Sequence, residues 1–387
     1  MKPKLVHVLD TFGSGGTEAG VLNLIRLGFY DTFDLHVVGL GLGNDQTYNK
    51  FVKALGPDRV NYLSDQRQNG SSRSIWTCEN ELKTALRRIS PEKIVLSGNV
   101  SVVLGRTVAA AEHNSAKVVT FEHSQIVADE PTKVRMRATS ITNDAVFCDS
   151  TFVREAIRPY YRDKIPAYVV PLTIQEPAEP RRIEVPEEFE ILSFGRLSPE
   201  KNYAELIMAA HSLAKKGARF KITIAGEGPQ RLQLEQLIGE LNLTEHVFLP
   251  GHIAGTAELR KRSHIYIQPS LHEGSCLAFV EAMAAGIVVV GTNVGGMKEY
   301  GEHGINMIKL QGGSQLTIAD TLSYVMRRYD SIAAPLSHAA LATAAEHFSA
   351  NSVRRQWEPA IAELHALKRQ TFMPHKDAHL SLGLPLP

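Results

Sequence analysis

Two glutamates separated by seven residues stand where a loop leads into a helix in the second half of the chain. Glu273 lies in the loop His272–Leu277, and Glu281 lies about one turn into the apolar helical pattern that follows. Free backbone N–H groups at such a helix start can bind an anion such as phosphate. These groups belong to Gly274, Ser275, Cys276 and Leu277. A carboxylate in an apolar helix needs hydrogen-bond donors, which ribose hydroxyls, backbone N–H groups or a buried arginine could supply. We interpret the two glutamates as functional.

A second candidate pair, Arg196 and Lys201, flanks a turn made by Ser198 and Pro199. The turn joins a strand pattern to a helix, so both cations could point into a cleft at the carboxyl end of that strand. Paired cations stabilise the charge that develops on a leaving diphosphate, where a metal ion might otherwise be needed. Solvated surface charges are the alternative interpretation.

A glycine-rich loop, Thr11–Glu18, lies between the first strand pattern and the first helix pattern. Gly15 and Gly16 would let the backbone approach a ligand closely, beside the N–H groups of the helix start. The spacing does not fit the G-x-G-x-x-G dinucleotide fingerprint, and a tight strand-to-helix turn would also explain these glycines.

Three smaller features follow strand patterns at the same kind of position. Glu227 and Gly228 lie in a sharp turn, and His252 ends a segment where a planar base could rest on the main chain. Turn chemistry alone also accounts for both segments. His123 ends a strand pattern in the first half, a position from which it could face the cleft.

Short β-branched runs alternate with amphipathic segments along the whole chain, the pattern of parallel sheets covered by helices. We therefore expect an α/β fold of two doubly wound Rossmann-like domains that face a cleft. The expected divisions are residues 1–174 for an acceptor-binding domain, 175–188 for a linker, 189–350 for a nucleotide-sugar-binding domain, 351–370 for a crossover helix and 371–387 for a disordered tail. The linker combines prolines and glutamates with few apolar residues.

Composition narrows the class of protein. The chain has 387 residues, and its 42 Lys and Arg nearly balance its 41 Asp and Glu, which argues against a nucleic-acid partner. No apolar run is long enough to cross a membrane, and the N-terminal run is too short for a secretion signal. The three cysteines are far apart, which favours neither a disulfide framework nor a zinc site. We expect a cytoplasmic protein without cofactor or metal.

Taken together and in this order, these segments resemble the retaining glycosyltransferases of family 4, which have the GT-B fold. The resemblance covers most of the chain and is strongest from Phe189 to Gly296. Its most specific part is the Glu-x7-Glu motif, preceded by the segment Gly195–Asn202. The Gly-Glu-Gly-Pro turn and the Phe-Leu-Pro-Gly segment also stand where that family has them.

The resemblance implies roles for the candidate residues. Arg196 and Lys201 would hold the donor diphosphate, Glu281 would bind the ribose, and Glu273 would contact the transferred sugar. The main chain at Ser275–Leu277 would hold phosphate and sugar. His123 would match the family's histidine beside the sugar, and Gly15 and Gly16 its first-domain glycine loop. Gly195, Glu227, Gly228, Gly274 and His252 complete the donor-binding set.

The mechanism implied is front-side attack within a retained ion pair, in which the leaving diphosphate helps to deprotonate the acceptor hydroxyl. The sequence has no Asp-x-Asp motif, the signature of metal-dependent transferases. One segment departs from the family, which has an Asn-Gly pair where this chain has Pro171–Ile174. That departure puts the hinge geometry in doubt.

The partners expected are a nucleotide sugar and a glycan, lipid-linked or small-molecule acceptor. Family frequency favours UDP, and GDP stays open. Lys133, Arg135 and Arg137 could meet anionic headgroups at the inner face of a membrane, although a solvated helix face explains them equally. Two alternatives stay open: a GT-B nucleotide-sugar 2-epimerase, and a non-catalytic partner subunit that binds nucleotide sugar.

Overall fold

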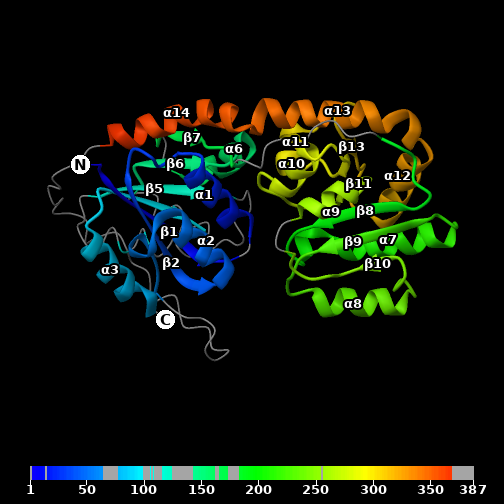
Figure 1. The fold of residues 1–387 in the computed structure, drawn as a ribbon, viewed down its shortest axis with the longest axis horizontal. Coiled ribbons are helices and arrows are strands. Elements are labelled where there is room, and N and C mark those ends of the chain that lie inside the picture. The colour runs from blue at the N-terminus through cyan, green and yellow to red at the C-terminus, as the bar shows by residue number, and fades with distance from the viewer. Residues whose placement is uncertain are drawn as a thin grey trace.

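The computed structural model describes residues 2–13, 15–63, 77–98, 105, 108, 116–123, 143–161, 165–172, 183–253 and 256–367. The basic residues 133, 135 and 137, the expected tail and most of the expected linker lie outside these ranges. Figure 1 shows two α/β units side by side, with two long C-terminal helices along one edge of both.

The first unit is built on a parallel sheet with the strand order β3-β2-β1-β4-β5-β6-β7. Its strands are β1 (Lys4–Phe12), β2 (Asp34–Gly43), β3 (Val60–Tyr62), β4 (Lys93–Ser97), β5 (Lys117–Glu122), β6 (Ala145–Cys148) and β7 (Ala167–Val169). The helices described here are α1 (Gly16–Arg26), α2 (Asp45–Leu55), α3 (Thr77–Ile89) and α6 (Thr151–Ile157). Runs such as β4 are buried at every residue because helices cover both faces of a parallel sheet.

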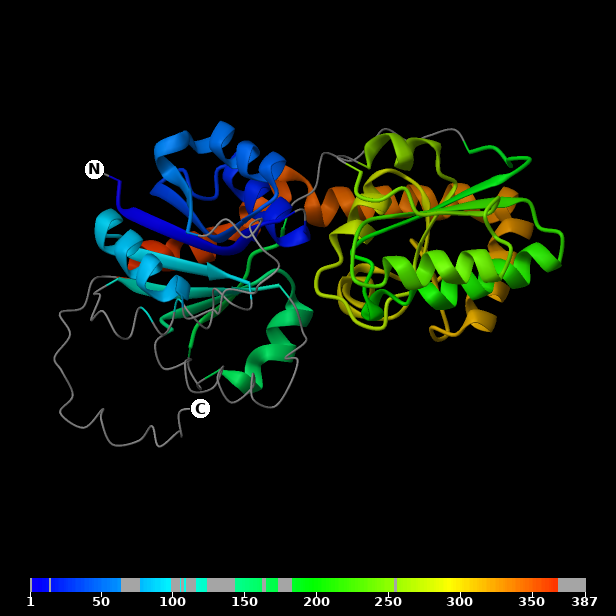
Figure 2. The same cartoon turned by 90° about the horizontal axis from the view of Figure 1, so that it is seen from below.

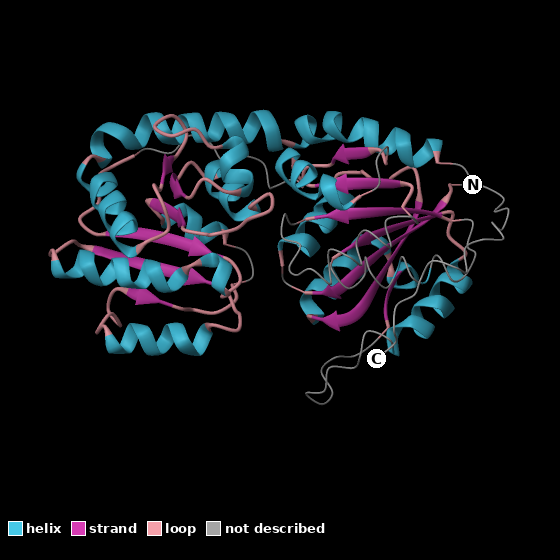
Figure 3. Cartoon of the chain, turned by 180° about the vertical axis from the view of Figure 1, so that it is seen from behind, coloured by secondary structure: helices cyan, strands magenta, loops and turns pink. Residues whose placement is uncertain are grey.

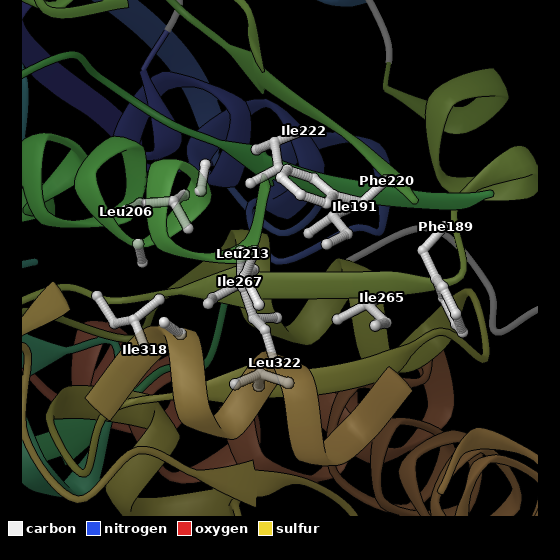
Figure 4. Close-up of a cluster of buried hydrophobic side chains, with 14 of the residues drawn as sticks. Phe189, Ile191, Leu206, Leu213, Phe220, Ile222, Ile265, Ile267, Ile318 and Leu322 are labelled. Atoms are coloured by element: carbon white, nitrogen blue, oxygen red, sulfur yellow. The ribbon is translucent and has the colours of Figure 1, made fainter. Parts of the chain in front are cut away.

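The second unit repeats this plan with the strand order β10-β9-β8-β11-β12-β13. Its strands are β8 (Phe189–Phe194), β9 (Phe220–Ala225), β10 (Val247–Phe248), β11 (Ile265–Gln268), β12 (Val288–Gly291) and β13 (Ile308–Lys309). Its helices are α7 (Tyr203–Lys215), α8 (Arg231–Glu240), α9 (Ala257–Arg262), α10 (Leu277–Ala284), α11 (Gly295–Tyr300), α12 (Gln315–Arg327) and α13 (Tyr329–Phe348). Side chains such as Leu206, Ile267 and Leu322 fill the space between sheet and helices (Figure 4).

The final helix, α14 (Ala350–Ala366), returns to the first unit. Its apolar face, which includes Trp357 and Leu364, belongs to the first unit's hydrophobic core. The Trp357 indole donates a 3.0 Å hydrogen bond to the Pro171 carbonyl, and Tyr168 donates one of 2.7 Å to Glu363. Figure 2 shows the two C-terminal helices running behind both units. The expected crossover helix is therefore present.

Helix α13 is absent from the elements that the sequence predicts. It is rich in alanine and packs against two cores, with Ala333 and Leu336 in one and Ala344 and Phe348 in the other. Its exposed face includes Pro335, Ala342 and Ala345, so the polar and apolar faces differ little in hydrophobicity and the periodic signal is weak.

The carboxyl ends of both sheets point toward the region between the units, as the arrowheads in Figure 3 show. The units also touch directly. Glu299 at the end of α11 accepts hydrogen bonds from the backbone N–H groups of Thr151 (3.2 Å) and Phe152 (2.9 Å) at the start of α6. The Lys298 ammonium lies 5.7 Å from the Phe152 ring centre. These contacts bring the strand ends that carry the candidate residues to one interface.

Candidate active site between the two domains

Lys201 and Glu273 form a buried ion pair at the carboxyl end of the second sheet. Lys201 Nζ lies 2.7 Å from Glu273 Oε1, and the two side chains are 18% and 6% exposed. Burial lowers the pKa of Lys201, but the Glu273 carboxylate, its hydrogen bond and contributions from Cys276 and Tyr203 together raise it by more, so the net pKa is increased. The lysine therefore stays charged, and its ammonium has two further N–H groups to offer an anion.

A chain of buried polar side chains fixes the Glu273 carboxylate. Ser270 donates to Glu273 Oε1 at 2.6 Å, and Gln268 Nε2 donates to Ser270 Oγ at 2.6 Å. The Tyr266 hydroxyl donates to Gln268 Oε1 at 2.5 Å. Burial raises the pKa of Tyr266 well above its ordinary value, so this phenol keeps its proton. We call Tyr266, Gln268 and Ser270 the second-domain relay; sequence analysis missed all three because they read as ordinary strand and loop residues.

The loop after Glu273 is held in an unusual shape by a pair of glycines that the sequence analysis did not select. Cys276 has φ 53°, in the left-handed region, directly before α10. A Cβ on Gly295 would lie 2.3 Å from the Gly274 carbonyl oxygen, and one on Gly296 would lie 2.0 Å from that of Ser275. The Gly-Gly sequence after a strand was the available signal, because only glycine permits this close approach. Gly274–Leu277 thus sit at the start of α10 beside Glu273.

Glu281 on α10 meets a buried arginine. Arg260 Nη1 lies 2.6 Å from Glu281 Oε2, and Arg260 also donates to Thr256. Burial raises the pKa of Glu281, and Arg260 opposes that shift. Of the donors that the sequence left open for this carboxylate, an arginine is the one found. The Glu281 side chain is still 32% exposed, and Arg260 and Thr256 both contact the same carboxylate oxygen, Oε2.

The remaining second-domain candidates lie on interlocked loops. Gly195 N–H donates to Ala225 O at 3.0 Å, and a Cβ on Gly228 would lie 2.3 Å from Leu197 O. Arg196 is exposed at the end of β8, whereas Glu227 pairs with Arg231 at 3.0 Å. His252 is exposed one loop further along the sheet.

In the first domain, the glycine loop meets α10 across the interface. Gly15 is the N-cap of α1, and a Cβ on Gly16 would lie 3.8 Å from Leu277 Cδ1. His123 lies at the end of β5, with its ring 4.4 Å from that of Phe121 and its Nε2 3.2 Å from Ser97 Oγ. The structure therefore places the glycine loop against the start of α10, with Lys201 and Glu273 joined at that helix's entry loop.

Comparison with solved structures identifies this architecture as the GT-B fold. HepE of Anabaena, in a structure described as a complex with UDP-glucose, superposes with a TM-score of 0.77 at 19% identity, over 93% of this chain and 99% of that chain. Sucrose-phosphate synthase of Thermosynechococcus elongatus gives 0.76 at 16% identity, over 94% and 99%. The predicted fold class is confirmed.

Sequence comparisons point to one group of enzymes. The family model described as "Glycosyl transferases group 1" matches residues 175–339. The chain is 30% identical over 148 residues to 2-deoxystreptamine N-acetyl-D-glucosaminyltransferase of Niallia circulans, over 38% of each chain. It is 29% identical over 164 residues to alpha-monoglucosyldiacylglycerol synthase of Streptococcus pneumoniae, over 38% of this chain and 37% of that protein. The matched segments thus span well under two thirds of these relatives, and the similarity to glycosyl transferases group 1 is located in the second domain.

Among the helices that the structure describes, none combines the length and apolar character needed to cross a bilayer.

Proposed function

We propose that this protein is a retaining glycosyltransferase of family 4 that transfers a sugar from a nucleoside diphosphate sugar to a hydroxyl acceptor without a metal ion. The observation that carries the proposal is the buried Lys201–Glu273 pair beside the start of α10, which also bears Glu281. The group 1 match covers this region, and one of the two relatives quoted by sequence is named as an N-acetyl-D-glucosaminyltransferase, the other as a synthase of a glucosylated lipid.

In this proposal each charged group has one task. Lys201 and Arg196 stabilise the diphosphate as the bond to the sugar breaks, and the first N–H groups of α10 bind the same anion. Glu281 accepts from the ribose hydroxyls. Glu273, held by Lys201 and Ser270, is oriented for the transferred sugar.

The acceptor attacks the anomeric carbon from the face that the diphosphate leaves. Attack on the same face retains the configuration without a protein nucleophile, and the diphosphate oxygen takes the proton of the acceptor hydroxyl. His123 would line the sugar from the first domain, and Gly15 and Gly16 would let the donor approach the main chain there.

UDP is the favoured nucleotide, because HepE, a structure of the same fold, is described in complexes with UDP and UDP-glucose. We propose a cytoplasmic reaction in glycan or glycoconjugate assembly, with a glycan, lipid-linked or small-molecule acceptor. A peripheral membrane contact would involve Lys133, Arg135 and Arg137, which lie outside the described ranges.

A thermal-shift screen with UDP, GDP and their glucose, N-acetylglucosamine and mannose conjugates tests the donor site, with and without EDTA. A ligand that binds only the folded state at 100 times its Kd adds about 2.7 kcal/mol of stability. We expect a shift with uridine nucleotides that EDTA leaves unchanged and that Glu281→Ala reduces. An EDTA-sensitive shift would refute metal independence, and no shift with any of these nucleotides would refute the donor site.

The two alternatives have their own readouts. A 2-epimerase would convert the nucleotide sugar alone into its sugar-inverted isomer, which NMR of the reaction mixture would show. A non-catalytic subunit would bind the nucleotide sugar and neither hydrolyse nor transfer it with any acceptor.

A further inference from the structure

A second buried chain of polar side chains runs through the first domain and ends at His123. The Tyr30 hydroxyl lies 2.8 Å from His7 Nδ1, and His7 Nε2 lies 2.7 Å from Ser97 Oγ. Ser97 Oγ in turn lies 3.2 Å from His123 Nε2. We call Tyr30, His7 and Ser97 the first-domain relay. His7 lies on β1 and Ser97 on β4, the strand between β1 and β5 in the sheet, whereas Tyr30 lies in the turn after α1.

Asp149 approaches His123 from the next strand end. It follows β6, its side chain is 2% exposed, and its Oδ2 lies 3.6 Å from His123 Nδ1. Within the part of the chain that the structure describes, neither His123 Nδ1 nor Asp149 Oδ1 has a hydrogen-bond partner, although both atoms are buried. A distance of 3.6 Å is too long for a hydrogen bond, but the carboxylate charge still acts on the facing nitrogen.

We propose that Asp149 is a positioning residue that keeps the proton of neutral His123 on Nδ1 and thereby sets the direction of the whole first-domain relay. A nitrogen lone pair facing a buried carboxylate is repelled, whereas an N–H in that place is attracted. His123 is the residue that the proposed function places beside the donor sugar, so the consequence for catalysis rests on that function.

The directions of the other hydrogen bonds in the first-domain relay follow from counting donors and acceptors. With the proton on Nδ1, His123 Nε2 is an acceptor, so the Ser97 hydroxyl donates to it. Ser97 then accepts from His7 Nε2–H, which leaves His7 Nδ1 to accept from Tyr30. Burial, with a smaller contribution from His123, lowers the pKa of His7 to about 3, so this ring is neutral and has one proton to place. The two histidines therefore hold opposite tautomers.

Histidine-labelled 15N NMR near pH 8 tests this without any ligand. We expect His123 as the Nδ1–H tautomer and His7 as the Nε2–H tautomer in the wild-type protein. The Nε2–H form of His123, or the Nδ1–H form of His7, in the wild-type protein would overturn the proposal.

Asp149→Asn provides the sharper test, because it removes the carboxylate charge that favours a proton on Nδ1 and introduces an amide N–H that can donate to an Nδ1 lone pair. We expect both histidines to exchange tautomers in this variant, although His7 is separated from residue 149 by Ser97 and His123. Asp144→Asn is the matched control: Asp144 lies at the opposite end of β6, paired with Lys117 at 2.8 Å. The control should leave both tautomers unchanged, and an unchanged His7 in Asp149→Asn would contradict the coupling.

If Asp149→Asn does not fold, Ser97→Ala tests whether the tautomers of His123 and His7 are coupled. This variant removes the link, so His123 should keep its Nδ1 proton while His7 loses its fixed tautomer. A His7 signal identical to that of the wild-type protein would contradict the relay.

The catalytic consequence is measured with UDP-glucose as the probe. We expect Asp149→Asn to slow the hydrolysis of UDP-glucose about tenfold while UDP binding stays within about twofold, because the nucleotide site lies in the other domain. Equal hydrolysis rates would refute the positioning role. A wild-type protein that does not bind UDP-glucose would instead count against the proposed donor, and the tautomer measurements would stand independently.

Discussion

The two domains each contain a buried chain of hydrogen bonds that ends at a candidate site residue, and the chains differ in their chemistry. The second-domain relay starts at Tyr266 and ends at a carboxylate paired with a lysine. Ammonium groups only donate and carboxylates only accept, so every bond in it has one direction. The first-domain relay passes through His7 and ends at His123, and each neutral imidazole can donate from either nitrogen.

This difference suggests that the two domains contribute to the site in different ways. The second domain presents a charged group whose position and polarity are fixed without a ligand; in the proposed function this is the preorganisation that stabilisation of a diphosphate needs. The first domain presents a ring whose proton depends on a neighbouring carboxylate. A change in nearby charge should therefore alter the proton positions of the first-domain relay more readily. Removal of a charged side chain should reduce stability and activity most in the second domain.

The largest expected effect comes from Lys201→Ala. Its loss leaves the Glu273 carboxylate buried without a cation, and breaking a buried ion pair costs about 3–5 kcal/mol. Urea unfolding should show this loss. Binding of the donor nucleotide or its turnover should fall at least tenfold, about 1.4 kcal/mol.

The double variant Lys201→Met with Glu273→Gln serves as the control for this change. Without the uncompensated charge it should regain most of the stability but not the activity. A Lys201→Ala protein as stable as the wild type would show that the pair is not buried in solution, and the contrast between the two relays would fail.

Mild acid, in contrast, should reduce the stability of the protein through the first-domain relay. The folded-state pKa of His7 is about 3, below the ordinary value of 6.5, so the unfolded chain binds the extra proton more readily. This contribution to stability is complete above pH 6.5 and is lost as the pH falls toward 3, at about 1.4 kcal/mol per pH unit. Between pH 7 and pH 5 the loss from His7 is about 2 kcal/mol.

Urea unfolding at pH 7 and pH 5 measures this dependence. His7→Gln should reduce the difference between the two pH values, although it lowers the stability at pH 7. His303→Gln, a change at an exposed histidine, should keep the wild-type difference. If His7→Gln kept it too, the first-domain relay would not be the acid-sensitive element.

Sequence analysis selected the candidate site residues at which the two relays end, but it did not identify the residues of the relays. Lys201, Glu273 and His123 stand at strand ends beside loops, where motif and topology both point to ligands. Their partners carry no local signal: His7 reads as one residue of a buried strand, and Asp149 as a turn residue. A contact such as Lys201 to Glu273, between residues far apart in sequence, exists only after the strands pair.

The same reason explains the partner of Glu281. The sequence showed that this carboxylate needed donors and named a buried arginine among them, but it could not select Arg260 from the arginines of the chain. Distant residues that meet through strand order leave no spacing rule in a single sequence, whereas a loop and the helix that follows it do.

The smallest of these effects tests whether the second-domain relay acts on the site or only on the fold. Ser270→Ala leaves Gln268 Nε2 without its acceptor and should cost about 1–2 kcal/mol. Ser337→Ala is the matched control, since Ser337 is also fully buried and donates to Gly286 O at 2.7 Å. Both variants should lose similar stability in urea, but only Ser270→Ala should weaken nucleotide binding, by about threefold, because Glu273 and Lys201 lose their fixed position. Equal binding in the two variants would mean that the lysine alone holds Glu273, and that the fixed polarity of this relay contributes nothing to the site.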